Sequence, residues 1–280
     1  MPSYDSPLPI TATVDIYVGY VQLVASDRFD TVVDVRPSDP ADASDVEAAE
    51  ATRVEFVDGE LTVRGPKRTF DFSKKSRSVD VVIELPTGSQ ARVDVTAGSV
   101  RSTGQLGECR VKNSMGRINL DRTGSLRADS SAGDVTVGDI GGDADLHSGT
   151  GQITAGNVAG SARVKNSNGN TELGAVAGDL RVRAANGNIT VARAGADVDV
   201  KTSMGHISIG ELVQGEAGLN SSMGNLEFGI AQGTAAWLDL KTAFGRVSNE
   251  LDASEGPELF DTTVRVTAHT ATGDIVVRRA

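Results

Sequence analysis

The sequence predicts an all-β fold, a parallel β-helix or β-solenoid of about ten coils with about 18 residues in each coil. A short phrase ending in glycine recurs along most of the chain, and apolar and polar residues alternate around it. Apolar residues make up 39% of the chain but aromatic residues only 4%, so the core must be aliphatic. A length of 280 residues suits such a repeat protein, because each coil contacts only its neighbours.

The recurring phrase is a polar run, a glycine and then a branched apolar residue, as in NSMGRI, SSAGDV, AANGNI and TSMGHI. The spacings between successive glycines are 18, 17, 18, 18, 18, 18, 19, 21 and 28 residues. The glycines are Gly98, Gly116, Gly133, Gly151, Gly169, Gly187, Gly205, Gly224, Gly245 and Gly273.

Aligning the copies on their glycines gives columns with a period of two, which is typical of β-strands. The residues five before and two after the glycine are mostly Val, Leu or Ile, and polar residues stand between them. Each coil is therefore a strand, a glycine turn, a second strand and a second turn, with equivalent strands paired in parallel and in register. Parallel crossovers favour a right-handed solenoid. Left-handed hexapeptide helices share the coil length, but their six-residue sub-repeat is not visible.

The corner of each coil has its own pattern. A tight corner requires positive φ, which glycine adopts without a Cβ clash. Three residues before the glycine stands Asn, Ser or Thr in most copies, for example Asn113, Ser130 and Asn166. Parity points these side chains inward, so we predict a buried ladder that bonds the turn backbone.

The N-terminal section is less regular. Weaker copies of the phrase surround Gly19 and Gly59, and we expect extra strands at 31–35 and 78–85. A capping-box pattern from Ser44 to Glu47 predicts a short helix over 45–53. We therefore predict decorated coils over 1–90 that cap the solenoid, a regular solenoid over 91–280 with a loop insertion at 249–260, and one continuous structural unit.

These phrases, together with the segments RPSDPADASDVEAAEATRVEFVDGELTV and VVIELPTGSQARV, resemble the bacterial putative-adhesin family of β-strand-repeat proteins, a domain of unknown function. The resemblance covers most of the chain. It implies a β-solenoid, offers no catalytic residues to carry over, and suggests exposure at a cell surface.

Charge and motifs exclude several classes of function. The net charge of −11 disfavours a nucleic-acid binder. We find no catalytic or phosphate-binding motif and no metal-ligand spacing, and we expect no cofactor and no enzyme activity. Cys109 falls in an inward column, which predicts a buried thiol. The histidines occupy unrelated outward positions. An enzyme acting on carbohydrate is the weak alternative, because Asp134, Glu172 and Glu227 share a sheet several coils apart.

The candidate binding site is a basic face formed by two outward columns, which acidic residues interrupt. A solvated sheet with ion pairs is the preferred interpretation, and an anionic polymer or polysaccharide binder is the alternative. The candidate residues are Arg110, Lys112, Arg127, Lys165, Arg181, Arg183 and Lys201.

Four large apolar residues stand directly before turn glycines: Met115, Met204, Met223 and Phe244. The last three fall on consecutive copies, so we expect them to stack and fill the corner, with Trp237 beside them.

The resulting prediction is a structural or interaction protein that presents flat faces to a macromolecular partner, protein or polysaccharide. The chain shows no export signal and no apolar run of membrane-spanning length, which predicts a cytoplasmic protein without membrane insertion. The final coil formed by 274–277 needs a cover. We slightly favour a monomer capped by the 249–260 insertion over an end-to-end dimer.

Overall fold

The computed structural model describes residues 2–66, 77–251 and 262–280. These residues form 25 strands and one short helix, which confirms the all-β solenoid of parallel strands. The chain divides into two compact units, 1–139 and 140–280. The domain boundaries drawn from the sequence stay predictions.

In the first unit, three strands pair in parallel and in register, so that Val93, Val111 and Ala128 align in one buried row. Shorter strands, each following a glycine turn, form the second face. The elements are β7 (Gln90–Thr103), β8 (Cys109–Met115), β9 (Ile118–Thr123), β10 (Leu126–Ala132) and β11 (Val135–Ile140).

The first long strand, β2 (Thr11–Ser26), lies inside this sheet. It runs parallel to β7 on one side, and to β5 (Glu60–Arg64) and β6 (Ser78–Pro86) on the other. It therefore separates β6 and β7, which follow one another in the sequence. Gly19 aligns with Gly98, as the repeat predicts.

The other N-terminal elements correct two details of the prediction. Gly59 is not a coil corner: it lies at φ +77° in the turn between β4 (Arg53–Val57) and β5, which pair antiparallel. The predicted helix exists as α1 (Ala43–Ala51), but its N-cap is Asp42, whose carboxylate accepts the Ser44 N–H. Both expected extra strands are present, as β6 and as β3 (Asp30–Pro37), which pairs antiparallel with β6 and with β1 (Ser3–Asp5).

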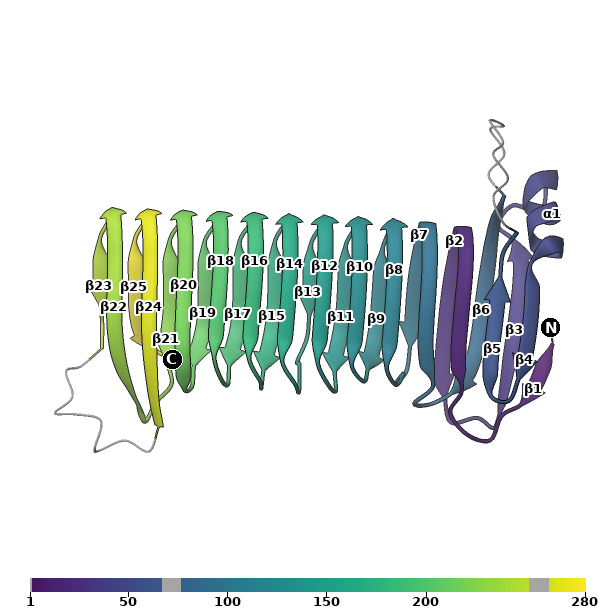
Figure 1. The fold of residues 1–280 in the computed structure, drawn as a ribbon, viewed down its shortest axis with the longest axis horizontal. Helices are drawn as coiled ribbons and strands as arrows, with labels where there is room; N and C mark the ends of the chain where they lie inside the picture. Colours follow the sequence, from purple (N-terminus) through teal and green to yellow (C-terminus); the bar gives the residue numbers. More distant parts are fainter. Residues whose placement is uncertain (1, 67–76, 252–261) are drawn as a thin grey trace. The chain divides into compact units, whose positions relative to one another are not determined.

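The second unit has two faces of parallel strands (Figure 1). One face has the spatial order β12, β14, β16, β18, β20, β24 and β22, with the bounds Ala144–Thr150, Ala162–Asn168, Leu180–Asn186, Val198–Met204, Gly215–Met223, Thr262–Thr272 and Thr234–Phe244. The other face has the order β13, β15, β17, β19, β21, β25 and β23, with the bounds Ile153–Ala155, Thr171–Val176, Ile189–Ala194, Ile207–Leu212, Leu226–Ile230, Ile275–Arg279 and Val247–Asn249.

The spatial order departs from the sequence order at one point. β24 pairs with β20 on one side and with β22 on the other. It therefore lies between these two strands, although it follows both of them in the sequence. The prediction that 274–277 forms the final coil is therefore wrong, since the last coil of this unit is β22 with β23. The predicted capping insertion falls largely on 252–261, which lie outside the described residues.

Backbone and side chains lock neighbouring coils together at the glycine corner. Gly187 has φ +135°, and a Cβ there would lie 2.1 Å from the carbonyl oxygen of Gly169. Beneath the corner, the buried Asn166 amide donates to the carbonyls of Gly151 (3.1 Å) and Gly169 (3.0 Å). Thr270 likewise donates to Gly224 at 2.9 Å, so the predicted buried ladder is confirmed.

A second ladder, which the sequence did not reveal, runs along the exposed side of the corner. In five successive layers of the second unit, the side chain directly after the glycine accepts the backbone N–H of the same position one layer on, at 2.8–3.0 Å. The members in spatial order are Asn170, Asn188, His206, Asn225, Asp274 and Arg246, whose N–H ends the series. The ladder therefore needs a short acceptor side chain in every layer.

The inward and outward assignment predicts a contrast between two substitutions. Val182 is fully buried, so Val182→Asp places an unpaired charge between coils and should cost about 4 kcal/mol or more. Thr190 faces solvent on β17, and Thr190→Asp should cost less than about 0.5 kcal/mol. Urea denaturation of both variants measures the difference, and equal losses would contradict the assignment.

The exposed ladder predicts a contrast at His206, whose Nδ1 accepts the Asn225 N–H at 2.9 Å. His206→Asn keeps an acceptor at this position and should leave stability nearly unchanged. His206→Leu removes it and should cost about 1 kcal/mol, because one backbone donor loses its partner. Denaturation midpoints compare the two variants, and an equally stable leucine variant would show that the ladder adds nothing.

Candidate functional site

Cations gather on the outward face of β14, β16 and β18 in the second unit. Arg163 aligns with Arg181, and Lys165 aligns with Arg183 and then Lys201. Strand spacing places successive side chains of a row about 4.8 Å apart at the backbone. We call these five residues the basic strip.

The strip follows from the alternation of the strands beneath it. Val164, Val182 and Val200 point inward and are fully buried in the core. The residues on either side of each valine must therefore point to solvent. Because the coils stack in register, similar residues in successive copies form continuous rows.

One carboxylate within the strip is tightly held. Asp199 accepts a hydrogen bond from Arg183 and pairs with Arg181 at 3.4 Å. The hydrogen bond from Arg183 lowers the pKa of Asp199, although partial burial opposes the shift. Arg183 also donates to the backbone carbonyls of Val182 (3.0 Å) and Asp199 (2.9 Å), which fixes its guanidinium.

The other three cations of the strip are less constrained. Within the part of the chain that the structure describes, Arg163, Lys165 and Lys201 form no ion pair. Two carboxylates, Asp145 and Asp199, stand in the same two rows, against five cations. The strip therefore keeps a net positive charge on a chain that is acidic as a whole.

The remaining candidate cations lie in the first unit on β8 and β10, where Arg110 aligns with Arg127. Lys112 pairs with Asp94 at 3.6 Å, and Arg127 pairs with Asp129 at 3.2 Å. This patch is thus largely neutralised by its own carboxylates. The interpretation as a solvated sheet with ion pairs therefore fits this patch on β8 and β10 better than it fits the basic strip.

Two features of this face were not predicted from the sequence. Arg163 is not among the residues predicted for the basic face, although it aligns directly with Arg181. His147 and His269 were regarded as unrelated, but both occupy the row of Lys165 and Lys241. Their equal distance from the turn glycine was the signal that could have placed them there.

Other candidate groups are not arranged for chemistry. Cys109 is buried, and desolvation raises the pKa of its thiol to about 12, so it is not a reactive nucleophile at neutral pH. Glu172 and Glu227 lie three strands apart, roughly 14 Å by strand spacing, which exceeds the reach of a glycosidase pair. Glu227 is engaged with Arg278 at 2.9 Å. Among the described residues, no three His, Cys, Asp or Glu side chains form a group that could hold a metal ion.

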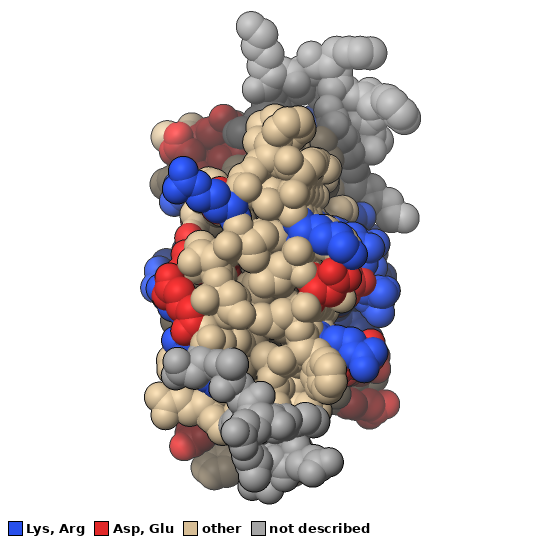
Figure 2. Space-filling view, turned by 90° about the vertical axis from the view of Figure 1, so that its left-hand side faces the viewer, with Lys and Arg blue, Asp and Glu red and all other residues tan. Residues whose placement is uncertain are grey.

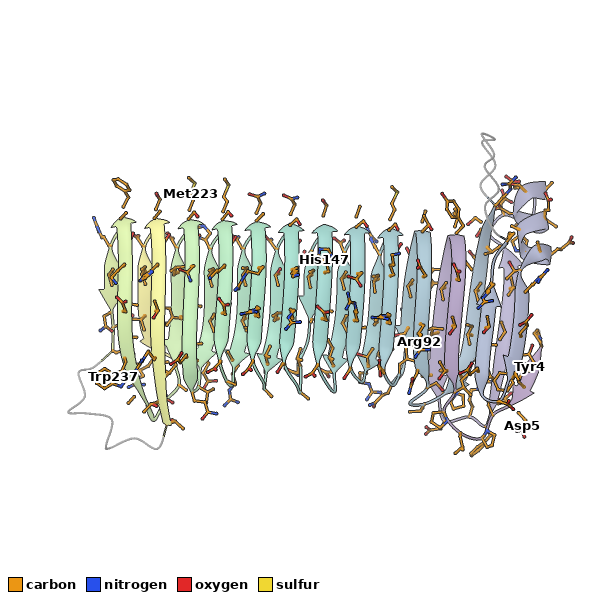
Figure 3. All side chains as sticks on the ribbon, viewed as in Figure 1. Tyr4, Asp5, Arg92, His147, Met223 and Trp237 are labelled. Atoms are coloured by element: carbon orange, nitrogen blue, oxygen red, sulfur yellow. The ribbon has the colours of Figure 1, made fainter. Side chains whose placement is uncertain are left out.

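The large apolar residues before the glycines do not fill the corner as expected. Met204 and Met223 are each 54% exposed and Phe244 is 75% exposed, and Thr272 on β24 stands between the last two. Trp237 does not pack beside them, because it lies toward the opposite end of its strand from the corner (Figure 3). The expected stacking holds for Met204 and Met223, which align on neighbouring strands. The predictions for Phe244, for Trp237 and for the filling of the corner were wrong, because neither the insertion of β24 nor the outward direction of these side chains is visible in the spacing.

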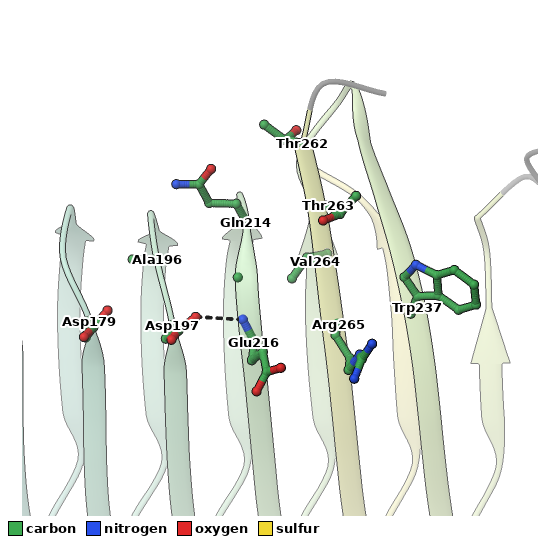
Figure 4. A pocket seen from close by; sticks show the side chains of 11 residues that line it. Asp179, Ala196, Asp197, Gln214, Glu216, Trp237, Thr262, Thr263, Val264 and Arg265 are labelled. Carbon is green, nitrogen blue, oxygen red and sulfur yellow. Dashed lines mark hydrogen bonds between the residues drawn. The ribbon is translucent and has the colours of Figure 1, made fainter. Parts of the chain in front are cut away.

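A shallow hollow in the second unit lies beside Trp237 (Figure 4). Its wall includes the carboxylates of Asp179, Asp197 and Glu216 and the guanidinium of Arg265. Asp197 already accepts the Glu216 N–H at 2.8 Å, and the indole lies across β22 from the acidic side chains. The hollow therefore lacks a convergent set of groups around one ligand position.

The fold and surface define a repeat protein of the β-solenoid class whose candidate site is a charged outer face. Residues 24–278 match the Toastrack DUF4097 family, and the chain belongs to this family. No curated protein matches the sequence.

Three solved structures illustrate what this chain is similar to. A putative adhesin from Parabacteroides distasonis is 10% identical, covers all of this chain and 96% of its own, and has a TM-score of 0.33. A putative cell adhesion protein from Clostridium sporogenes is 11% identical, covers all of this chain and 98% of its own, and has a TM-score of 0.22. A putative lipid binding protein from Parabacteroides distasonis is 12% identical, covers 98% of this chain and 95% of its own, and has a TM-score of 0.37.

Within the described residues, no helix has the length and apolar character needed to cross a bilayer.

The lowered pKa of Asp199 predicts a dependence of stability on pH. Its ion pairs stabilise the fold above about pH 4, where an unfolded Asp is ionised, and this contribution disappears as the pH falls through the lower folded pKa. Asp199→Asn should therefore melt at a temperature that falls less between about pH 5 and pH 2 than that of the unmodified protein. Melting curves across this range test the effect, and parallel curves would contradict it.

Proposed function

We propose that the protein is a non-enzymatic interaction protein whose basic strip binds a linear polyanion of the acidic polysaccharide class. The observation that carries the proposal is the alignment of like charges in register on β14, β16 and β18. Like charges directly opposite each other on paired strands destabilise a sheet. Only one carboxylate, Asp199, lies among the cations of these strands.

The surroundings of the strip support a polysaccharide over other polyanions. The row of Lys165, Arg183 and Lys201 continues into His147 on one side and Asn220 on the other, which are groups that can bond hydroxyls. The row of Arg163 and Arg181 is bordered by Asp145 and Asp199. No aromatic residue occupies the rows of these strands, whereas binders of single-stranded nucleic acid use aromatic side chains as stacking platforms.

The strip is also rigid, which favours binding of an extended polymer. Its backbone is held by pairing on both sides of β14, β16 and β18, and the valines beneath are fully buried. Because the backbone beneath the strip is already fixed, binding costs conformational freedom only in the side chains. The period of about 4.8 Å suits a polymer that carries a regularly repeated carboxylate or sulfate.

A charge-reversal experiment tests the function. Lys165→Glu combined with Lys201→Glu changes two cations that hold no structural ion pair, so the fold should be retained. Affinity for immobilised heparin and polygalacturonate at low salt should fall roughly tenfold or more, because these cations provide much of the local positive field. Binding by the unmodified protein should also weaken steeply with salt.

The matched control reverses two exposed arginines of the first unit that are not part of the strip, Arg117→Glu with Arg122→Glu. It changes net charge equally and should bind almost as well as the unmodified protein. If the unmodified protein flows through both polymers at low salt, or if both double variants lose binding equally, the basic strip is not the binding site.

A further inference from the structure

The last coil of the second unit leaves an open edge. β22 pairs with β24 on one side, and no described strand pairs with it on the other. Its 11 residues therefore offer a row of backbone donors and acceptors. Such an edge is a template for the addition of another strand.

The core is also uncovered at this end. Leu238 and Leu240 point inward on β22 but are only half-buried, whereas Val266 and Ala268, their neighbours on β24, are fully buried. Val247 on β23 is 46% exposed. Seen from this end, a central band without charged side chains is flanked by charges on both sides (Figure 2). Partly exposed apolar side chains inside a charged rim are typical of an interface between proteins.

We propose that this end is the docking surface for a second copy of the chain, with β22 paired antiparallel to β22 of that copy. A two-fold axis normal to the sheet at Leu240 relates the two strands. Such an axis extends the sheet across the interface and keeps inward side chains facing inward. It also covers the half-buried leucines of both copies.

Charge selects this register among the alternatives. The outward residues of β22 include Asp239 and Lys241, both exposed. Centring the pair on Leu240 sets Asp239 opposite Lys241 of the second copy, and Lys241 opposite Asp239. Shifting the centre by one residue in either direction sets Asp239 against Asp239 or Lys241 against Lys241, which is repulsive.

Side-chain size agrees with the same register. Trp237 falls opposite Ala243 of the second copy, and Phe244 falls opposite Ala236. Both aromatic residues are more than half exposed in the single chain, so pairing buries two large apolar surfaces against small partners. A cross-strand arrangement of large against small side chains avoids steric conflict.

The proposed dimer adds ion pairs to those of the single chain. Asp239 now pairs with Lys241 on its own strand at 3.0 Å and lies 3.8 Å from His269. In the proposed dimer each carboxylate gains a second lysine across the interface. This inference is independent of the polyanion proposal. It concerns the edge strand β22, whereas the basic strip lies on the outward face of β14, β16 and β18.

Charge exchange between two copies tests the proposal. Sedimentation equilibrium should show that the unmodified full-length chain forms a dimer as its concentration rises. Asp239→Lys and Lys241→Asp should each associate at least tenfold more weakly, because each sets like charges opposite one another. An equimolar mixture of the two variants should dimerise again, as should the variant carrying both changes.

Two further measurements keep the test specific. Asn220→Asp, in the same row as Lys241 but on the interior strand β20, should leave dimerisation unchanged. The fluorescence of Trp237, the single tryptophan of the chain, should shift to shorter wavelength as the dimer forms.

Three results would overturn the proposal. They are an unmodified chain that stays monomeric at all concentrations, a dimer that either charge reversal leaves intact, and a mixture of the two variants that does not associate. A strictly monomeric chain would mean that this edge is covered from within the chain or by a different partner.

Discussion

Successive coils approach one another so closely at the glycine corner that no Cβ fits between them. At Gly187 and its equivalents, the space that a Cβ would occupy is filled by the carbonyl of the previous layer. Positive φ at the same residue turns the chain from one face to the other. The corner therefore fixes both the direction of the chain and the distance between layers. The buried Asn, Ser and Thr ladder then satisfies the carbonyls that this packing encloses.

Register at the corner determines the character of each face. Because every glycine stacks on the previous one, residues at the same distance from it form a row across the sheet. A row of valines becomes a continuous core, and a row of lysines and arginines becomes a charged strip. The function proposed for the strip thus rests on the same constraint that builds the fold. A slip of one residue would reverse the inward and outward sets and destroy both.

The repeat predicted the solenoid, the burial of Val182 and the inward position of Cys109, because these depend only on local spacing and parity. It did not predict that β24 inserts between β20 and β22. The spacing from Gly245 to Gly273 indicates extra residues between the two glycines, but it does not indicate which strands the following strand pairs with. Gly59 was misplaced for a similar reason: a hairpin turn and a coil corner both require glycine at positive φ. Charge balance at the candidate site also needed the structure. The sequence shows Asp199 two residues before Lys201, whereas its partners are Arg181 and Arg183 on the neighbouring strand.

The inserted strands have a consequence for each unit. β2 is enclosed by β7 on one side and by β5 and β6 on the other, and β24 is enclosed by β20 and β22. These two strands, the second and the second-last of the described chain, thus pair on both edges, which protects them from fraying. In the second unit, the open edge falls instead on β22, an internal segment whose neighbours in the chain are both part of the solenoid. A strand anchored at both ends holds its backbone groups and its outward charges in fixed positions. Such an edge recognises one register more strictly than a frayed terminus could.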